Sequence, residues 1–187
     1  MTTLRLDRDK QWLVEVRCVP SPNCDERPAG AVIDLVVIHG ISLPPGRYGG
    51  PHIDQLFTNS LETGAHPYFS GISTLRVSSH LLIDRKGLIT QYVPFDRRAW
   101  HAGESAFQGR QACNDYSIGV ELEGSDEEAY EQCQYEAAVD VTKLLIANWP
   151  QITEQRIVAH SAISPGRKTD PGPAFDWNYF FSLMEKR

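Results

Sequence analysis

Short apolar runs bounded by turn-forming residues constrain the fold of this chain more than any other feature. The run Leu35–Ile38 precedes the Pro/Gly-rich segment Ser42–Gly46, where a strand cannot continue, so it predicts a buried strand. The run Arg156–Ala159 predicts a second short strand. A histidine directly follows each run, His39 after the first and His160 after the second. If the two strands are parallel neighbours, both imidazoles lie at the same rim of one sheet.

The rest of the pattern alternates between strands and helices and predicts a mixed α/β fold. Helical spacing of apolar residues after Pro51 predicts a helix over roughly 51–61. Residues 79–83 and 88–93 predict two strands of a hairpin, because Asp84–Gly87 is a short polar link that ends in glycine. A final amphipathic helix is expected after Asp176, which can cap it.

The segment Tyr116–Glu123 predicts a strand with two different faces. Its even-numbered residues are apolar, whereas Glu121 and Glu123 lie on the opposite face. At least one of these two carboxylates is also consistent with a solvated surface group. Ser125 and Glu128 then form a capping-box pattern that predicts the start of the longest helix, which ends before Pro150.

Length and composition are those of one folded domain without a nucleic-acid partner. The chain has 187 residues, 41% of them hydrophobic, and no linker or repeat divides it, so we expect a single domain over 1–187. Its net charge of -6 argues against binding many phosphates. We expect a monomer.

The sequence gives no sign of export or of a membrane partner. No apolar run reaches the length of a membrane span, and the first residues lack the apolar core of a signal peptide. The four cysteines form no CxxC pair, which favours reduced thiols over a disulfide framework. We therefore expect a cytoplasmic protein. The cysteines are Cys18, Cys24, Cys113 and Cys133.

Two imidazoles and a carboxylate predict a catalytic zinc site. His160 begins a Gly/Pro loop that also carries Lys168 and Asp170, and His39 can complete the set. Three protein ligands leave the fourth tetrahedral position of zinc open to water, which indicates a metallohydrolase. Taken singly, each residue has a plainer reading: a hydrogen-bonded histidine at a strand end, a solvated lysine, or an aspartate that caps the turn before Pro171.

The other four histidines carry less information. His52 lies early in the expected helix and His66 precedes a proline, so both are expected at the surface or in turns. His80 fits a packed core imidazole. His101 follows Trp100, and this pair fits either a ligand-facing surface or a partly buried structural contact.

Four motifs, in this order, are similar to those of the type 2 N-acetylmuramoyl-L-alanine amidase and peptidoglycan-recognition-protein family. They are Val37–Gly46, Arg97–Gly103, Asn114–Gly124 and Ala159–Gly172, and the similarity extends from about Val19 to Trp177. The family fold, a central mixed β-sheet flanked by helices, agrees with the element order above. The resemblance implies that zinc is the cofactor.

The resemblance also implies a role for each candidate residue. His39, His160 and Asp170 would be the zinc ligands. Glu121 and Lys168 would be catalytic, with Tyr68 near the reacting centre, and the substrate groove would be lined by Arg76, Trp100, His101 and Arg167.

The implied reaction is hydrolysis of the amide between 1,6-anhydro-N-acetylmuramic acid and L-alanine of a muropeptide, during recycling of degraded cell wall. Glu121 could take the proton of the attacking water and deliver it to the leaving amine, while Lys168 offsets charge on the tetrahedral oxygen. Family members commonly carry asparagine after the first zinc histidine, where this chain has Gly40. Replacing Gly40 with asparagine is therefore expected to change the kinetics by about one hydrogen bond, roughly 0.5–1.5 kcal/mol.

Two other classes of function stay open. One is a recognition module that binds the peptidoglycan stem peptide without cleaving it, which loss of a zinc ligand would favour; here all three ligand positions are filled. The other is a serine esterase, but the chain has no GxSxG nucleophile motif.

Overall fold

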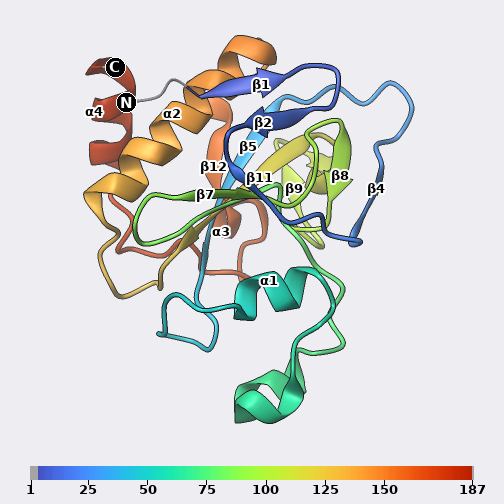
Figure 1. Ribbon diagram of the computed structural model, residues 1–187. Helices are drawn as coiled ribbons and strands as arrows, with labels where there is room; N and C mark the ends of the chain where they lie inside the picture. The colour runs from blue at the N-terminus through green and yellow to red at the C-terminus, as the bar shows by residue number, and fades with distance from the viewer. Residues whose placement is uncertain (1–3, 187) are drawn as a thin grey trace.

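A six-stranded mixed sheet forms the centre of the computed structural model, which describes residues 4–186 (Figure 1). Its strand order is β12-β5-β11-β6-β7-β3. All neighbouring strands pair in parallel except β6 and β7, which form the predicted antiparallel hairpin. The strands are β3 (Arg17–Cys18), β5 (Leu35–Ile41), β6 (Leu81–Ile83), β7 (Ile89–Gln91), β11 (Ser117–Glu123) and β12 (Ile157–Ala159). The predicted mixed α/β fold is confirmed.

Within residues 4–186, three two-stranded sheets and four short 3-10 helices surround this central sheet. The pairs are β1 (Arg5–Asp7) with β2 (Trp12–Val14), β4 (Cys24–Glu26) with β8 (Arg97–Ala99), and β9 (Ala106–Phe107) with β10 (Arg110–Gln111). The 3-10 helices are η1 (Thr63–Ala65), η2 (Pro67–Gly71), η3 (Cys113–Asp115) and η4 (Glu154–Arg156). In Figure 1 the segment with η1 and η2 projects from the bottom of the molecule.

Alternate residues of the central strands pack against different helices. Of strand β5, Val36 and Ile38 belong to the core that α2 and α4 cover, whereas Leu35 and Val37 pack with Ile163 of α3 on the other face. Helices α2 and α4 contact each other along that first face (Figure 1). The helices are α1 (His52–Phe57), α2 (Gln132–Asn148), α3 (His160–Ile163) and α4 (Trp177–Lys186). Because side chains alternate, an odd-numbered residue beyond Val37 faces away from α2.

The end of one helix and the start of another differ from the sequence prediction. Helix α1 ends at Phe57, earlier than expected, and the capping box of α2 is formed by Glu131 and Gln134 instead of Ser125 and Glu128. The segment after Ser125 is held in another conformation, because the carbonyl of Asp126 accepts a hydrogen bond from the Ala174 amide at 3.1 Å. A long-range contact of this kind leaves no trace in local sequence.

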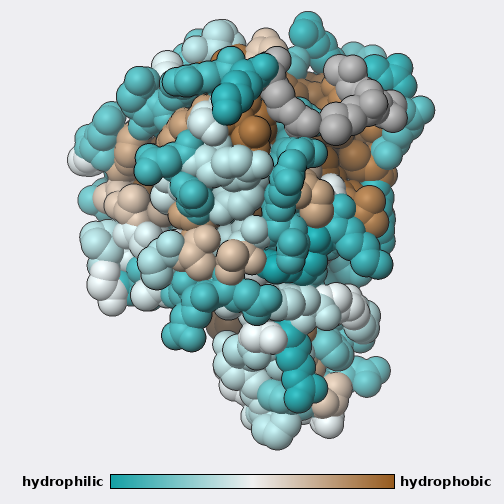
Figure 2. Space-filling view, turned by 90° about the vertical axis from the view of Figure 1, so that its left-hand side faces the viewer, coloured by the Kyte–Doolittle hydropathy of each residue, from teal (hydrophilic) through white to brown (hydrophobic). Residues whose placement is uncertain are grey.

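The predicted capping of the last helix is confirmed, since the Tyr179 amide donates to the Asp176 carboxylate at 2.9 Å. Within residues 4–186 no helix is long and apolar enough to cross a membrane. Polar residues cover most of the face in Figure 2, with hydrophobic residues visible between them.

Arg27 holds together the segments that precede strand β11. Its guanidinium donates to the backbone carbonyls of Phe95, Asn114, Asp115 and Ser117 at 2.9–3.3 Å. Burial lowers the pKa of Arg27 to about 10, so the group keeps its charge at neutral pH. One side chain thus provides a donor for four backbone carbonyls.

Replacing Arg27 with methionine should lower the free energy of unfolding by about 2–4 kcal/mol, because carbonyls that accept from a charged donor lose their partner. The matched control is Arg97→Met, whose ion pair with the exposed Glu26 spans 3.9 Å and should contribute little. Urea unfolding followed by circular dichroism measures both. Equal losses in the two variants would contradict this role for Arg27.

Candidate active site

The register of three parallel strands brings the predicted histidines and Glu121 to one place. Strand β5 lies between β11 and β12, and His39 is the register partner of Glu121. Ala159, the last residue of β12, pairs with Ile38, so His160 follows beside His39. The expectation that the two histidine-bearing strands are parallel neighbours is confirmed.

Three donor atoms converge within van der Waals distance of one another. The Nδ1 atoms of His39 and His160 are 2.9 Å apart, and Oδ2 of Asp170 lies 3.3 Å from the first and 3.0 Å from the second. Zinc bonds of about 2.0–2.1 Å in tetrahedral geometry separate neighbouring ligands by roughly 3.3 Å. Both imidazoles are buried, with 1% and 2% of their surface exposed. These three residues therefore fit a small metal ion, and no movement of the backbone is needed to assemble them.

The ionisation of these groups also suits metal binding. Burial lowers the pKa of His39 to about 4, so the imidazole is neutral at pH 7 and offers a lone pair. Burial acts to raise the pKa of Asp170, but its contacts with His160 and His39 outweigh this effect and hold the pKa well below the usual range. The site therefore presents a carboxylate and an uncharged imidazole.

Glu121 lies beside this set with one oxygen unused. Its Oε1 is 3.9 Å from Nδ1 of His39, and its Oε2 is buried without a hydrogen-bond partner among the described residues. Burial, followed by the negative charge of Asp170, raises the pKa of Glu121 well above its ordinary value, while Lys168 acts to lower it. Carboxyl groups whose pKa is displaced by burial and by a charged neighbour are common among catalytic acids and bases.

A cavity of about 500 Å³ opens over these residues. One wall is apolar and comes from the projecting segment, including Tyr68 and Leu75, each of which is 46% exposed. Nine of the ten residues singled out from the sequence line this cavity: His39, Tyr68, Trp100, His101, Glu121, His160, Arg167, Lys168 and Asp170.

The tenth residue, Arg76, does not line the cavity. Its exposed guanidinium is turned back onto the carbonyls of Ser73 and Leu75, at 3.4 and 3.2 Å. Arg167 lines the cavity but donates to the carbonyls of Ala102 and Glu104, so it also braces that loop. Contacts of the two arginines with substrate stay predictions.

Two polar side chains near the site have roles that sequence reasoning missed. Glu123 is buried and accepts from the amides of Gly49 and Arg85, so it anchors loops instead of solvating the sheet. The Asn114 side chain accepts from the amides of His101 and Ala102 at 3.1 and 2.8 Å. The only sequence signal was that Glu123 and Asn114 belong to one motif, which gave neither partner.

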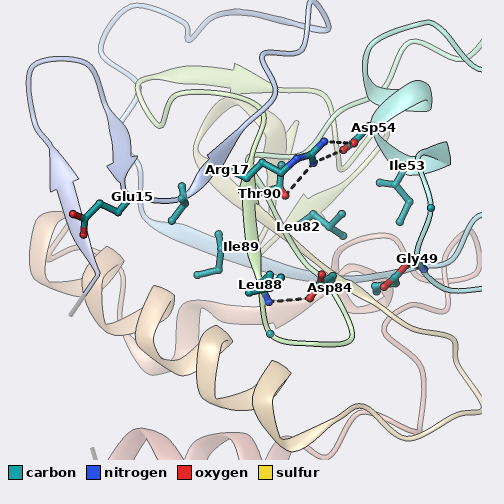
Figure 3. Close-up of a pocket in the computed structure, with 14 residues that line it drawn as sticks. Glu15, Arg17, Gly49, Ile53, Asp54, Leu82, Asp84, Leu88, Ile89 and Thr90 are labelled. Atoms are coloured by element: carbon teal, nitrogen blue, oxygen red, sulfur yellow. Dashed lines mark hydrogen bonds and ion pairs between the residues drawn. The ribbon is translucent and has the colours of Figure 1, made fainter. Parts of the chain in front are cut away.

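A second cavity of about 500 Å³ has no histidine among the residues that line it (Figure 3). Its charged groups are paired within the chain: Arg17 binds Asp54 at 2.5 Å and Thr90 at 3.3 Å, and Asp84 accepts from the Leu88 amide at 2.9 Å (Figure 3). None of the residues singled out from the sequence lines it. The histidine cavity is therefore the candidate active site.

Comparison with known proteins agrees with this assignment. Residues 29–173 match the N-acetylmuramoyl-L-alanine amidase family. The chain is 57% identical over 176 residues to the 1,6-anhydro-N-acetylmuramyl-L-alanine amidase AmpD of Salmonella typhimurium, and the match covers 94% of each protein.

Two solved structures are similar to this one. A crystal structure of a selenomethionine derivative of AmpD has a TM-score of 0.92 and 55% identity, and it covers 96% of this chain and 98% of that one. The amidase AmiD of Escherichia coli, in complex with the substrate anhydro-N-acetylmuramic acid-L-Ala-D-gamma-Glu-L-Lys, has a TM-score of 0.60 and 27% identity, covering 96% of this chain and 65% of that one. The motifs, the fold and these matches agree, and the chain belongs to the type 2 N-acetylmuramoyl-L-alanine amidase family.

Proposed function

We propose that this protein hydrolyses the amide bond between 1,6-anhydro-N-acetylmuramic acid and L-alanine of muropeptides, with zinc held by His39, His160 and Asp170. The observation that carries the proposal is the convergence of three metal-binding atoms beside Glu121, whose buried Oε2 has no partner among the described residues. The names of the AmpD relatives and the substrate bound to AmiD support the choice of bond.

Two imidazoles with one carboxylate form a donor set typical of catalytic zinc, because three protein ligands leave a fourth position free. Zinc held by these three residues would supply Lewis acidity, which polarises an amide carbonyl and makes water acidic enough to attack at neutral pH. The cavity above the three ligands leaves room for the scissile bond.

Glu121 is the group that moves the proton in this proposal. Its unpartnered oxygen can accept the proton of the attacking water and deliver it to the nitrogen of the leaving L-alanine. The positive charge of Lys168 acts on this site, since it acts to lower the pKa of both Glu121 and His39. Its ammonium can offset the negative charge that develops on the carbonyl oxygen.

The walls of the cavity suit the two parts of a muropeptide. Tyr68, Leu75 and Trp100 offer apolar and aromatic surface for the sugar ring or for the stem. Arg76 and Arg167 are exposed and can meet the carboxylates of the stem peptide. The four cysteines are free, which supports action in a reducing compartment, and we place the reaction in the cytoplasm on soluble fragments.

Intact anhydro-muropeptide should be cleaved by the purified protein into the anhydro-sugar portion and a peptide with a free L-alanine amine, as mass spectrometry would show. A chelator should abolish cleavage, and added zinc should restore it, because zinc then binds again to the three proposed ligands. Binding of the fragment without any cleavage, at full zinc loading, would instead identify a recognition module.

The metal ligands are tested by the double variant His39→Ala, His160→Ala. It should lose the single equivalent of zinc that the wild-type protein binds, measured by elemental analysis after gel filtration. Some loss of thermal stability is compatible with the proposal, since a bound metal also stabilises its loop. Retention of stoichiometric zinc would show that other residues bind it.

Glu121→Gln should keep zinc and fold but reduce turnover by roughly 10²–10⁴-fold, because the amide cannot take up the proton of water. The matched control is Glu128→Gln, which changes a carboxylate on the segment that follows the same strand and outside the cavity lining. Steady-state rates on anhydro-muropeptide measure both variants. Near-normal turnover of Glu121→Gln would remove it as the proton carrier.

The structure changes the expectation for Gly40. A Cβ at this position would overlap the hydroxyl of Tyr130, and one at Gly124 would overlap the ring of the same tyrosine. Tyr130 thus lies in a slot between two glycines, from which its hydroxyl donates at 3.0 Å to the carbonyl of Pro171. Since Pro171 follows Asp170, the tyrosine braces the loop that carries a proposed ligand.

Gly40→Asn should therefore act through steric overlap and not through one added hydrogen bond. We expect it to lower the free energy of unfolding by about 1–3 kcal/mol. In a Tyr130→Phe background the overlapping hydroxyl is absent, so the same substitution should cost clearly less. Denaturant unfolding of the two single variants and the double variant gives this coupling directly. Strictly additive losses would show that Tyr130 and position 40 do not compete for space.

A further inference from the structure

His101 connects the proposed ligand His39 to a chain of hydrogen bonds that ends at a backbone carbonyl. Nε2 of His39 lies 2.9 Å from Nδ1 of His101, and Nε2 of His101 lies 3.1 Å from the hydroxyl of Ser117. That hydroxyl is 2.6 Å from the carbonyl oxygen of Cys113. His39, His101, Ser117 and Cys113 are thus connected in sequence by hydrogen bonds, starting from a proposed metal ligand.

The carbonyl oxygen of Cys113 fixes the donor and acceptor of each hydrogen bond in this series. A carbonyl oxygen only accepts, so the single proton of the Ser117 hydroxyl is directed to Cys113 and the Ser117 oxygen must accept from Nε2 of His101. An uncharged imidazole carries one proton, and in His101 that proton is on Nε2, so its Nδ1 accepts. His39 must then donate through Nε2, which leaves its Nδ1 unprotonated, with a lone pair available for a metal ion.

The second histidine ligand is oriented by the same principle. Nε2 of His160 lies 3.2 Å from the carbonyl oxygen of Ala102 and donates to it, so Nδ1 of His160 is the free lone pair. Each of the two imidazoles therefore turns an acceptor towards the other across 2.9 Å, with the Asp170 carboxylate beside them. A cation between the three satisfies all of them.

Both the ring and the backbone of His101 are held in place. A Cβ at Gly119 of strand β11 would overlap the ring, so the glycine creates the space it occupies. The backbone that carries the ring is held as well, because the amides of His101 and Ala102 both donate to the Asn114 side chain. A rotated ring would lose its contacts with both His39 and Ser117.

We propose that His101 is a positioning residue that sets the tautomer of His39, so that Nδ1 of His39 faces the metal ion. This inference rests on the proposed zinc site but concerns a different residue and a different property. The sequence resemblance implied a substrate-groove role for His101, and its place in the cavity lining is compatible with that prediction as well.

The test is the zinc affinity of three variants, measured by competition with a chelator of known affinity. His101→Phe keeps an aromatic ring but removes the acceptor for Nε2 of His39, and it should weaken zinc binding by about 10–100-fold. His101→Asn places an oxygen acceptor near the position of Nδ1 and should recover most of the loss. The matched control His52→Phe changes a histidine that packs on Phe69 outside the cavity lining, and its zinc affinity should equal that of the wild type.

Nitrogen-15 spectra of histidine in the zinc-free protein give a readout that a purely structural role would not change. Wild-type His39 should be protonated at Nε2, and His101→Phe should show a mixture of the two tautomers. If His101→Phe does not fold, Ser117→Ala serves instead: it removes the acceptor for His101 and should give the same mixture with a several-fold weaker zinc affinity.

Two results would overturn the inference: a folded His101→Phe that binds zinc as tightly as the wild type, or wild-type His39 protonated at Nδ1. Either result leaves the proposed amidase function standing, provided that the wild type binds zinc and cleaves the substrate. A wild-type protein that binds no zinc would refute the function and this inference together.

Discussion

The register between β5 and its two parallel neighbours is the constraint on which the site depends. It aligns His39 with Glu121 on one side and delivers His160 on the other, all at the same level of the sheet. Because side chains alternate with a period of two, a shift of one residue would turn His39 into the apolar core under α2. The buried partners Val36 and Ile38 oppose such a shift, since both would then move out of that core. Hydrophobic burial thus fixes the positions of the polar atoms.

Close approach of side chains to backbone is the second physical theme of the site. Gly40 and Gly124 make room for Tyr130, and Gly119 makes room for His101. In each case a large ring takes the space of a missing Cβ and then makes a directed hydrogen bond to a proposed ligand or to the residue that follows one. These glycines therefore help to orient the proposed metal-binding groups, as the polar residues do.

The elements with strong local patterns could be predicted from sequence, and the long-range contacts could not. The buried runs ending at His39 and His160, and the hairpin around Asp84–Gly87, follow from periodicity and turn residues, and they were confirmed. The shift of the capping box to Glu131 and the bracing role of Tyr130 depend on contacts that span more than 40 residues, from Asp126 to Ala174 and from Tyr130 to Pro171. No local propensity reports such pairs.

The candidate site divides in the same way. The proposed metal-binding set could be selected from its residue types and their positions near strand ends, whereas the orientation of each imidazole depends on groups such as Ala102 and Ser117 that have no distinctive sequence. Arg76 shows the converse, because a plausible substrate residue in the sequence turns back onto its own loop in the structure. Residue type indicates chemistry, but hydrogen-bond geometry decides which atom is available.

Anomalous diffraction at the zinc absorption edge from crystals of the zinc-loaded protein tests the central claim most directly. The account predicts one strong peak, bonded to the Nδ1 atoms of His39 and His160 and to the carboxylate of Asp170, with the cavity and Glu121 on its open side. A peak bonded through Nε2 of either histidine, or located at the free cysteines, would contradict it.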